Sequence, residues 1–198
     1  EAYKAQVVIP FFREHFARLD RQVVLMDVLG AIHAGPEALD DLRRAMARIL
    51  LAFRHGRSGI LASLLGQKRV SRILFAATKA DHLHHLQHPQ LTAITEAMLR
   101  EASERAQFAG AEVAALALAS LRATTEEMLA DGAESLPAVR GRFKDGRRAA
   151  LYAGELPSDP MQLLAPARAG AAQWLDGDFD IMSFEPAPMT LRHGEGPP

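Results

Sequence analysis

The sequence predicts an α/β fold built on a mainly parallel sheet, followed by a β-hairpin and an irregular C-terminal region. Short apolar runs alternate with helical patterns as far as about residue 120, and an Asp-Gly pair at 145–146 lies between two strand-like runs. The alternation is typical of parallel sheets with right-handed crossovers, and Asp-Gly favours a tight hairpin turn. We therefore expect an α/β unit over residues 1–135 and the hairpin with irregular structure over 136–198.

The first half of the chain should contain two helices with a strand between them. Phe11 to Leu19 repeat at helical spacing, and Val23 to Met26 form an apolar run typical of a strand buried on both faces. Pro36 is placed to open the next helix. Its apolar stripe consists of Leu39, Leu42, Met46, Ile49, Leu50 and Phe53.

Two further strands and a helix follow. Ile73 to Ala77 and Val113 to Leu118 are the predicted strands, and Pro89 opens the helix between them, which Gly110 ends. The apolar positions of this helix are Leu91, Ile94, Met98, Leu99, Ala102 and Phe108. The hairpin is predicted to pair residues 139–143 with 148–153.

Composition limits the classes of function. The 198 residues carry a formal net charge of -1, which argues against a broad nucleic-acid-binding surface. The sequence has no cysteine, so disulfides and thiolate metal sites are excluded. No apolar stretch approaches a membrane span and no secretory signal is found, so the cytoplasm is the expected location. Because the chain opens at Glu1 and ends in Gly and Pro residues, we expect it to be cut from a longer protein.

An acidic residue follows the first predicted strand. Asp27 could hold magnesium directly or through water while the metal bridges phosphates. Gly30 would let a backbone N–H approach the terminal phosphate, because no side chain intervenes. Asp-x-x-Gly alone is equally typical of a solvated turn at a strand end.

A second motif, Thr78-Lys79-Ala80-Asp81, follows the second predicted strand. A fixed Asp81 carboxylate could accept both N–H donors on one edge of guanine, and adenine offers no matching pair. The aliphatic stem of Lys79 could lie over the base. The alternative is a capped turn in which Asp81 begins the following helix. Ala119 and Ser120 after the third strand add a third motif, and the order of the three favours a nucleotide site.

These residues resemble the YcjX-like family. The resemblance rests on residues 11–22, on 24–29 and 34–37, on 73–85 with Thr78-Lys79-Ala80-Asp81-His82, on 105–111 and on 152–157. It implies a P-loop NTPase-like fold with three layers, a bacterial cytoplasmic protein associated with stress responses, and binding of GTP or GDP with Mg²⁺. The implied nucleotide-binding residues are Asp27, Gly30, Thr78, Lys79, Asp81, Ala119 and Ser120, with Asp27 at the metal.

The sequence also departs from P-loop GTPases. It holds no G-x-x-x-x-G-K-[ST], so the resemblance places the phosphate-binding Walker A segment upstream of Glu1. Thr78 replaces the usual asparagine, which would loosen a tie to neighbouring loops. Ala31 stands where Ras-like enzymes have the glutamine that orients water. We expect the intact protein to hydrolyse NTP slowly and this fragment alone to be inactive.

Two charged clusters have plainer explanations. His82, His84, His85 and His88 could form a zinc or nickel site, with His84 and His88 on one helix face, but helix caps and loop contacts are favoured. Similarly, a solvated hairpin is favoured over an anion site for Arg140, Arg142, Lys144, Arg147 and Arg148, and a surface position for His33.

Three functions remain open. The first is a guanine-nucleotide switch, whose protein partner the sequence does not identify. The second is a protein-interaction scaffold with a decayed nucleotide site, motivated by Ala31 and Thr78. The third is an ATP-specific P-loop enzyme in which Thr78-Lys79-x-Asp81 is structural.

Overall fold

The computed structural model describes residues 20–52, 70–143, 145–174 and 184–185 of the chain. A three-stranded parallel sheet has the order β1-β2-β3, and its strands are Arg21–Met26, Arg72–Ala77 and Glu112–Ala117. A separate three-stranded antiparallel sheet contains β4, β5 and β6, which are Thr124–Asp131, Glu134–Arg142 and Arg148–Leu151. The helices are α2 (Val28–Ala34), α3 (Pro36–Ala52), α5 (His88–Phe108) and α6 (Met161–Arg168), with 3₁₀ turns η3 (Ala80–His82) and η4 (His85–Gln87). The α/β character predicted from the sequence is confirmed.

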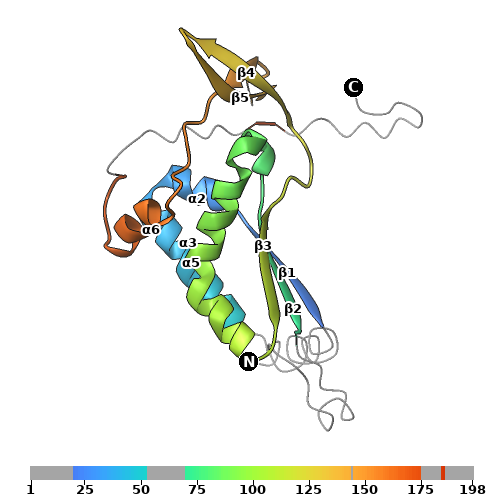
Figure 1. Cartoon of the computed structure of the whole chain (residues 1–198), viewed down its shortest axis with the longest axis vertical. Coiled ribbons are helices and arrows are strands. Elements are labelled where there is room, and N and C mark those ends of the chain that lie inside the picture. The colour runs from blue at the N-terminus through green and yellow to red at the C-terminus, as the bar shows by residue number, and fades with distance from the viewer. Residues whose placement is uncertain (1–19, 53–69, 144, 175–183, 186–198) are drawn as a thin grey trace, which may run out of the picture.

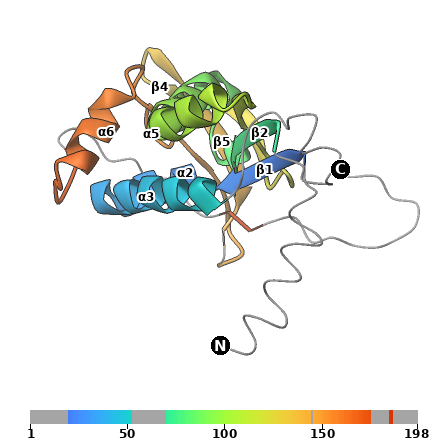
Figure 2. The same cartoon turned by 90° about the horizontal axis from the view of Figure 1, so that it is seen from below.

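The helices lie on one face of the parallel sheet (Figures 1 and 2). Val24, Phe75 and Ala115 are register partners whose side chains face the helices, and Phe75 is fully buried. On the other face Val23 and Leu25 are 60% and 61% exposed. The expectation that this strand is buried on both faces is therefore wrong for the described residues, because no described helix covers its second face. Three layers are likewise not seen in this part of the chain.

Helix α5 begins and ends where the sequence predicts. Pro89 lies in its first turn, and Gly110 adopts a φ of 92° just beyond its end, where a side chain would be strained. Leu91, Ile94, Met98 and Leu99 are buried. Phe108, however, is 97% exposed, because the buried stripe continues through Ala102 to Ala106 and leaves Phe108 on the outer side.

The second sheet stands beyond the carboxyl ends of the parallel strands (Figure 1). The predicted hairpin is confirmed, since β5 and β6 pair on either side of the Asp145-Gly146 turn. Strand β4 was not predicted from the sequence; it pairs with β5 along its whole length through a turn at Gly132, whose φ is 61°.

The C-terminal region is less irregular than predicted. Helix α6 packs against α3, with Leu163, Leu164 and Ala167 buried. The sequence did not predict this helix, because Pro166 lies inside it and proline disfavours a helix interior. The predicted helix over 11–19 and the whole of the predicted loop over 56–66 lie outside the described residues. Within the described parts of the chain, no helix combines the length and the apolar character needed to cross a bilayer.

Candidate functional site

The predicted motifs gather at the carboxyl edge of the parallel sheet. Met26, Ala77 and Ala117 are register partners at the ends of the three strands. The residues that follow them therefore emerge side by side, at the edge where open α/β sheets bind ligands. Thr78 ties two of these ends together, since its backbone N–H and its hydroxyl both donate to the Met26 carbonyl, at 2.8 and 3.0 Å. The threonine hydroxyl thus links the end of β2 to the end of β1.

Asp27 begins helix α2, an element that the sequence did not predict. Its Oδ1 accepts a hydrogen bond of 3.0 Å from the backbone N–H of Gly30, the usual arrangement of an N-cap. A Cβ at position 30 would lie 2.8 Å from the Asp27 carboxylate, so only glycine lets the carboxylate sit there without displacement. The Asp-x-x-Gly pattern is therefore a capped helix start in this structure, and the Gly30 N–H already has an acceptor.

Lys79 joins the first motif to the second. Its Nζ lies 2.5 Å from Oδ2 of Asp27, a contact between residues 52 positions apart. The Lys79 backbone has a φ of 61°, which is uncommon for a residue with a side chain and often marks a functional position. Both side chains are about half exposed, at 49% and 43%, so the ion pair contributes little to stability and a competing cation can displace the ammonium.

Asp81 is buried next to the loop that carries the third motif. It is 5% exposed, and its Oδ2 accepts a hydrogen bond of 2.7 Å from the backbone N–H of Ala123. Its carbonyl accepts a hydrogen bond from the hydroxyl of Thr124. Ala119 and Ser120, which are exposed, belong to the same loop. The structure thus brings this loop to Asp81, and one carboxylate oxygen is already used.

The four histidines after Asp81 do not form a single metal-binding group. His88 bonds the Ala80 carbonyl through Nε2 at 2.8 Å, and the buried His82 meets the Phe184 ring edge-on. His84 caps η4, whereas His88 begins α5, so these two residues do not share a helix face as the sequence suggested. The metal-ligand geometry instead involves His84, His85 and Glu126.

Glu126 was not found by sequence reasoning, because it lies on the unpredicted strand β4. Its Oε2 is 2.8 Å from Nδ1 of His85, and its Oε1 accepts from the His85 backbone N–H at 3.0 Å. Partial burial acts to raise the pKa of Glu126, but the hydrogen bonds and positive charge of His85 outweigh it, so the pKa lies below its ordinary value.

Three of the hairpin arginines pair with nearby carboxylates, and Lys144 of the predicted cluster lies outside the described residues. Arg140 contacts Glu127 through two hydrogen bonds of 2.8 Å, and this pairing raises the pKa of the guanidinium. Arg147 lies 2.6 Å from Asp145, and Arg142 lies 3.6 Å from Glu185. All three arginines are exposed, as a solvated hairpin predicts. His33 is also exposed, in the last turn of α2.

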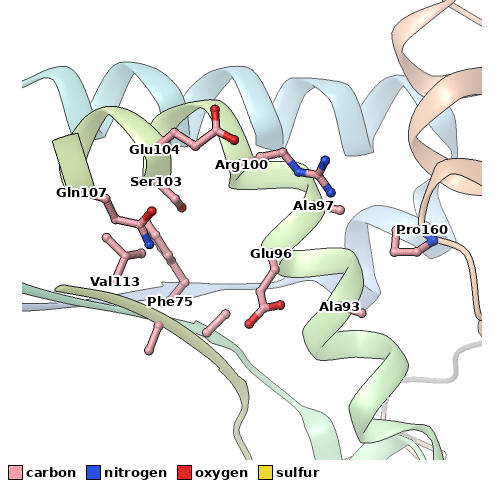
Figure 3. Close-up of a pocket in the computed structure, with 12 residues that line it drawn as sticks. Phe75, Ala93, Glu96, Ala97, Arg100, Ser103, Glu104, Gln107, Val113 and Pro160 are labelled. Carbon is pink, nitrogen blue, oxygen red and sulfur yellow. The ribbon is translucent and has the colours of Figure 1, made fainter. Parts of the chain in front are cut away.

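A hollow of about 620 Å³ lies elsewhere, between α5 and the edge strand β3 (Figure 3). Glu96, Arg100 and Glu104 line it from the helix, and Phe75 and Val113 line it from the sheet. None of the predicted nucleotide-binding residues contributes to its lining. The candidate site is consequently an open edge of the sheet and not this hollow.

Comparison with known proteins agrees with the resemblance seen in the sequence. The chain matches the YcjX-like family, DUF463, over residues 1–198. It is 34% identical over 190 residues to the Ras-like GTPase YcjX of Escherichia coli strain K12, covering 96% of this chain and 39% of that protein. The Ras-like GTPase YcjX of Shewanella oneidensis is 32% identical over 190 residues, covering 96% of this chain and 37% of that protein. The chain thus spans about two fifths of the length of these relatives, and it belongs to the YcjX-like family.

Proposed function

We propose that the intact protein is a guanine-nucleotide-binding P-loop NTPase that hydrolyses GTP slowly. In this proposal the chain supplies the residues that face the magnesium ion, the terminal phosphate and the base. The main support for this proposal is the contact between Asp27 and Lys79 at the carboxyl ends of two adjacent parallel strands. Asp81 follows Lys79 by two residues. The two relatives named Ras-like GTPases support the same class of activity.

The Asp27 carboxylate is suited to magnesium. It is about half exposed, and one of its oxygens already holds a cationic group, the Lys79 ammonium. Magnesium in nucleotide sites is bound by one or two carboxylates together with phosphates and water, and it would neutralise charge on the phosphates. In the nucleotide-bound protein, Asp27 would turn from Lys79 to the metal, which frees the lysine stem to lie along the base.

Gly30 gives the site two alternative states. Its backbone N–H now donates to Asp27 at 3.0 Å, and a terminal phosphate would compete for the same donor. If the phosphate takes it, the first turn of α2 loses its cap and must rearrange. Helix α2 is therefore the element expected to respond to the nucleotide.

Asp81 is the proposed reader of the base. A carboxylate has about four lone-pair positions, so the bond from Ala123 leaves acceptor capacity for the two N–H donors of guanine. The exposed Ala119 and Ser120 would flank the base. Because Asp81 is 5% exposed, the loop at 118–123 has to move aside for the base to reach it.

Slow hydrolysis is expected because position 31 is an alanine. Ala31 has no group that could orient an attacking water, and the Walker A segment is proposed to come from outside these 198 residues.

The second candidate function is an ATP-specific or scaffolding protein. The hydrogen bond between Asp81 and Ala123 favours it, because a purely structural role of Asp81 would produce the same bond.

Titration of the intact protein with fluorescent GDP and ADP, each with magnesium, separates these functions. The Asp81→Asn variant keeps an acceptor oxygen for Ala123, so it should fold. It should lose at least about tenfold in GDP affinity and gain affinity for XDP, since a hydrogen bond to a charged group contributes about 1.5–3 kcal/mol. Asp145→Asn, at the exposed hairpin turn, is the matched control and should change neither affinity. Equal competition by ADP, or absence of nucleotide binding, would reject the guanine proposal.

A further inference from the structure

Three potential metal-ligating side chains meet between the 3₁₀ turn η4 and strand β4. His84, His85 and Glu126 each offer a ligand atom, and these atoms lie within 4.8 Å of one another. The histidines follow Asp81 on the α/β unit, whereas Glu126 lies on β4 of the second sheet. None of the three belongs to the proposed nucleotide site.

The cluster is held in place before any ion binds. Glu126 accepts from both the ring and the backbone of His85, at 2.8 and 3.0 Å, and its side chain is 25% exposed. His84 is buried, and its ring centroid lies 4.4 Å from that of His85. Nδ1 of His84 accepts a long hydrogen bond of 3.4 Å from the Leu86 N–H, which is easily given up.

Two imidazoles and one carboxylate form a ligand set of known preference. They bind zinc in sites that keep a fourth position open, with metal–ligand distances of about 2.0–2.2 Å. Ligand atoms around such an ion stand about 3–4 Å apart, and those of this cluster lie within 4.8 Å of one another, so small side-chain rotations would bring them to that spacing. The exposed ring of His85 has the freedom to make that adjustment.

We propose that His84, His85 and Glu126 bind Zn²⁺ or a similar divalent transition metal, with solvent at the fourth position. The ion would join β4 to the segment that follows Asp81. Asp81 already contacts this part of the second sheet, through Ala123 and Thr124. Metal binding would thus add a third contact to the two hydrogen bonds that already hold the loop beside Asp81.

Zinc titration of the intact protein tests the site. The protein is stripped with a chelator and titrated with Zn²⁺ against a chromogenic competitor, in buffer free of magnesium and nucleotide. The wild-type protein should bind one Zn²⁺ ion tightly. Each of the variants His84→Asn, His85→Asn and Glu126→Gln should lower the zinc affinity by at least about tenfold, because losing even a residue that only supports a metal ligand costs about 10–100-fold in affinity. Co²⁺ in place of zinc should give d–d absorption that the same variants abolish.

Two matched variants separate a built site from scattered surface ligands. Glu127→Gln removes the neighbouring carboxylate, which pairs with Arg140, and His33→Asn removes an exposed histidine away from the cluster. Both should bind zinc as wild type does. Circular dichroism of the metal-free variants verifies folding, and if buried His84 fails this check, His85 and Glu126 decide the outcome. A wild type that binds no zinc tightly, or controls that lose as much affinity as the cluster variants, would leave only a hydrogen bond between His85 and Glu126.

Discussion

Asp27 combines two contacts that a single substitution can separate. Its Oδ1 caps α2 at Gly30, and its Oδ2 pairs with Lys79. Asparagine is as good an N-cap as aspartate but carries no charge, whereas alanine removes both contacts. The cap is local to α2, while the ion pair crosses from one strand to the next.

We predict that Asp27→Asn leaves α2 nearly as stable as in the wild type, because an exposed ion pair contributes at most about 1 kcal/mol. Asp27→Ala should destabilise the helix by about 0.5–2 kcal/mol more than Asp27→Asn does, because it removes the cap. Hydrogen–deuterium exchange of the peptide that covers α2 measures the difference. Equal exchange rates in the two variants would show that the cap contributes nothing. Both variants should lose magnesium-dependent nucleotide binding if the proposed function holds.

At the scale of elements, strand β5 depends on the close contact between its Gly141 and the ring of Phe184. Gly141 faces the ring of Phe184, and a Cβ at this position would lie 2.2 Å from a ring carbon. Phe184 is buried, stacks on Phe143 with centroids 5.2 Å apart, and meets His82 edge-on. This single ring therefore connects the second sheet to the segment after Asp81.

Gly141→Ala should displace the Phe184 ring and destabilise the protein by about 1–3 kcal/mol, the usual cost of overpacking. In a Phe184→Ala background the same change should cost almost nothing, because the clashing atoms are gone. Thermal unfolding of the four proteins in this double-mutant cycle gives the coupling. Additive effects would mean that Gly141 is required for a reason unrelated to Phe184.

At the scale of the whole molecule, Gln87 connects distant parts of the chain. Its amide nitrogen donates to the Gly154 carbonyl, and its amide oxygen accepts from the Leu156 N–H, both at 2.8 Å. The side chain is 5% exposed, and its partners lie 67 and 69 residues further on. Gln87 thereby fixes the segment that leads from the second sheet to α6.

Gln87→Ala should destabilise the protein by at least about 2 kcal/mol, because it leaves two backbone groups without their partners and each costs about 1–3 kcal/mol. Thermal unfolding checks the size of the effect, and hydrogen exchange of the peptide over 152–158 checks its place. Gln107→Ala, on the exposed side of α5, is the control and should stay close to wild type. A similar loss in both variants would contradict a specific role for Gln87.

A hydrogen bond from Trp174 connects the C-terminal segment to helix α2 and so to the edge of the parallel sheet. Among the described residues, helices cover one face of the parallel sheet. Trp174, in the C-terminal segment, donates to the Ile32 carbonyl at 2.9 Å. Ile32 lies in α2, which begins at Asp27. Tertiary packing consequently links the candidate nucleotide edge to α2, and α2 to the C-terminal segment.

The sequence by itself determined the three parallel strands, helices α3 and α5, and the hairpin formed by β5 and β6, but not helix α2. Those features depend on local chemistry: apolar runs, prolines that open helices, and the glycine beyond α5. It also placed Asp27 and Lys79 at one edge, because parallel strands end side by side. Strand β4 was missed because its sequence, Thr-Thr-Glu-Glu-Met-Leu-Ala-Asp, lacks a regular alternation of apolar and polar residues. Helix α6 was missed because Pro166 lies inside it.

Only the tertiary structure decided which groups meet. The Lys79–Asp27 pair, the His85–Glu126 contact and the Gln87 bridges join residues from 41 to 69 positions apart. No periodicity in the sequence encodes such separations, because they depend on how the sheets and helices pack. The exposure of Phe108 and Val23 has the same origin, since burial depends on whether another element covers a side chain.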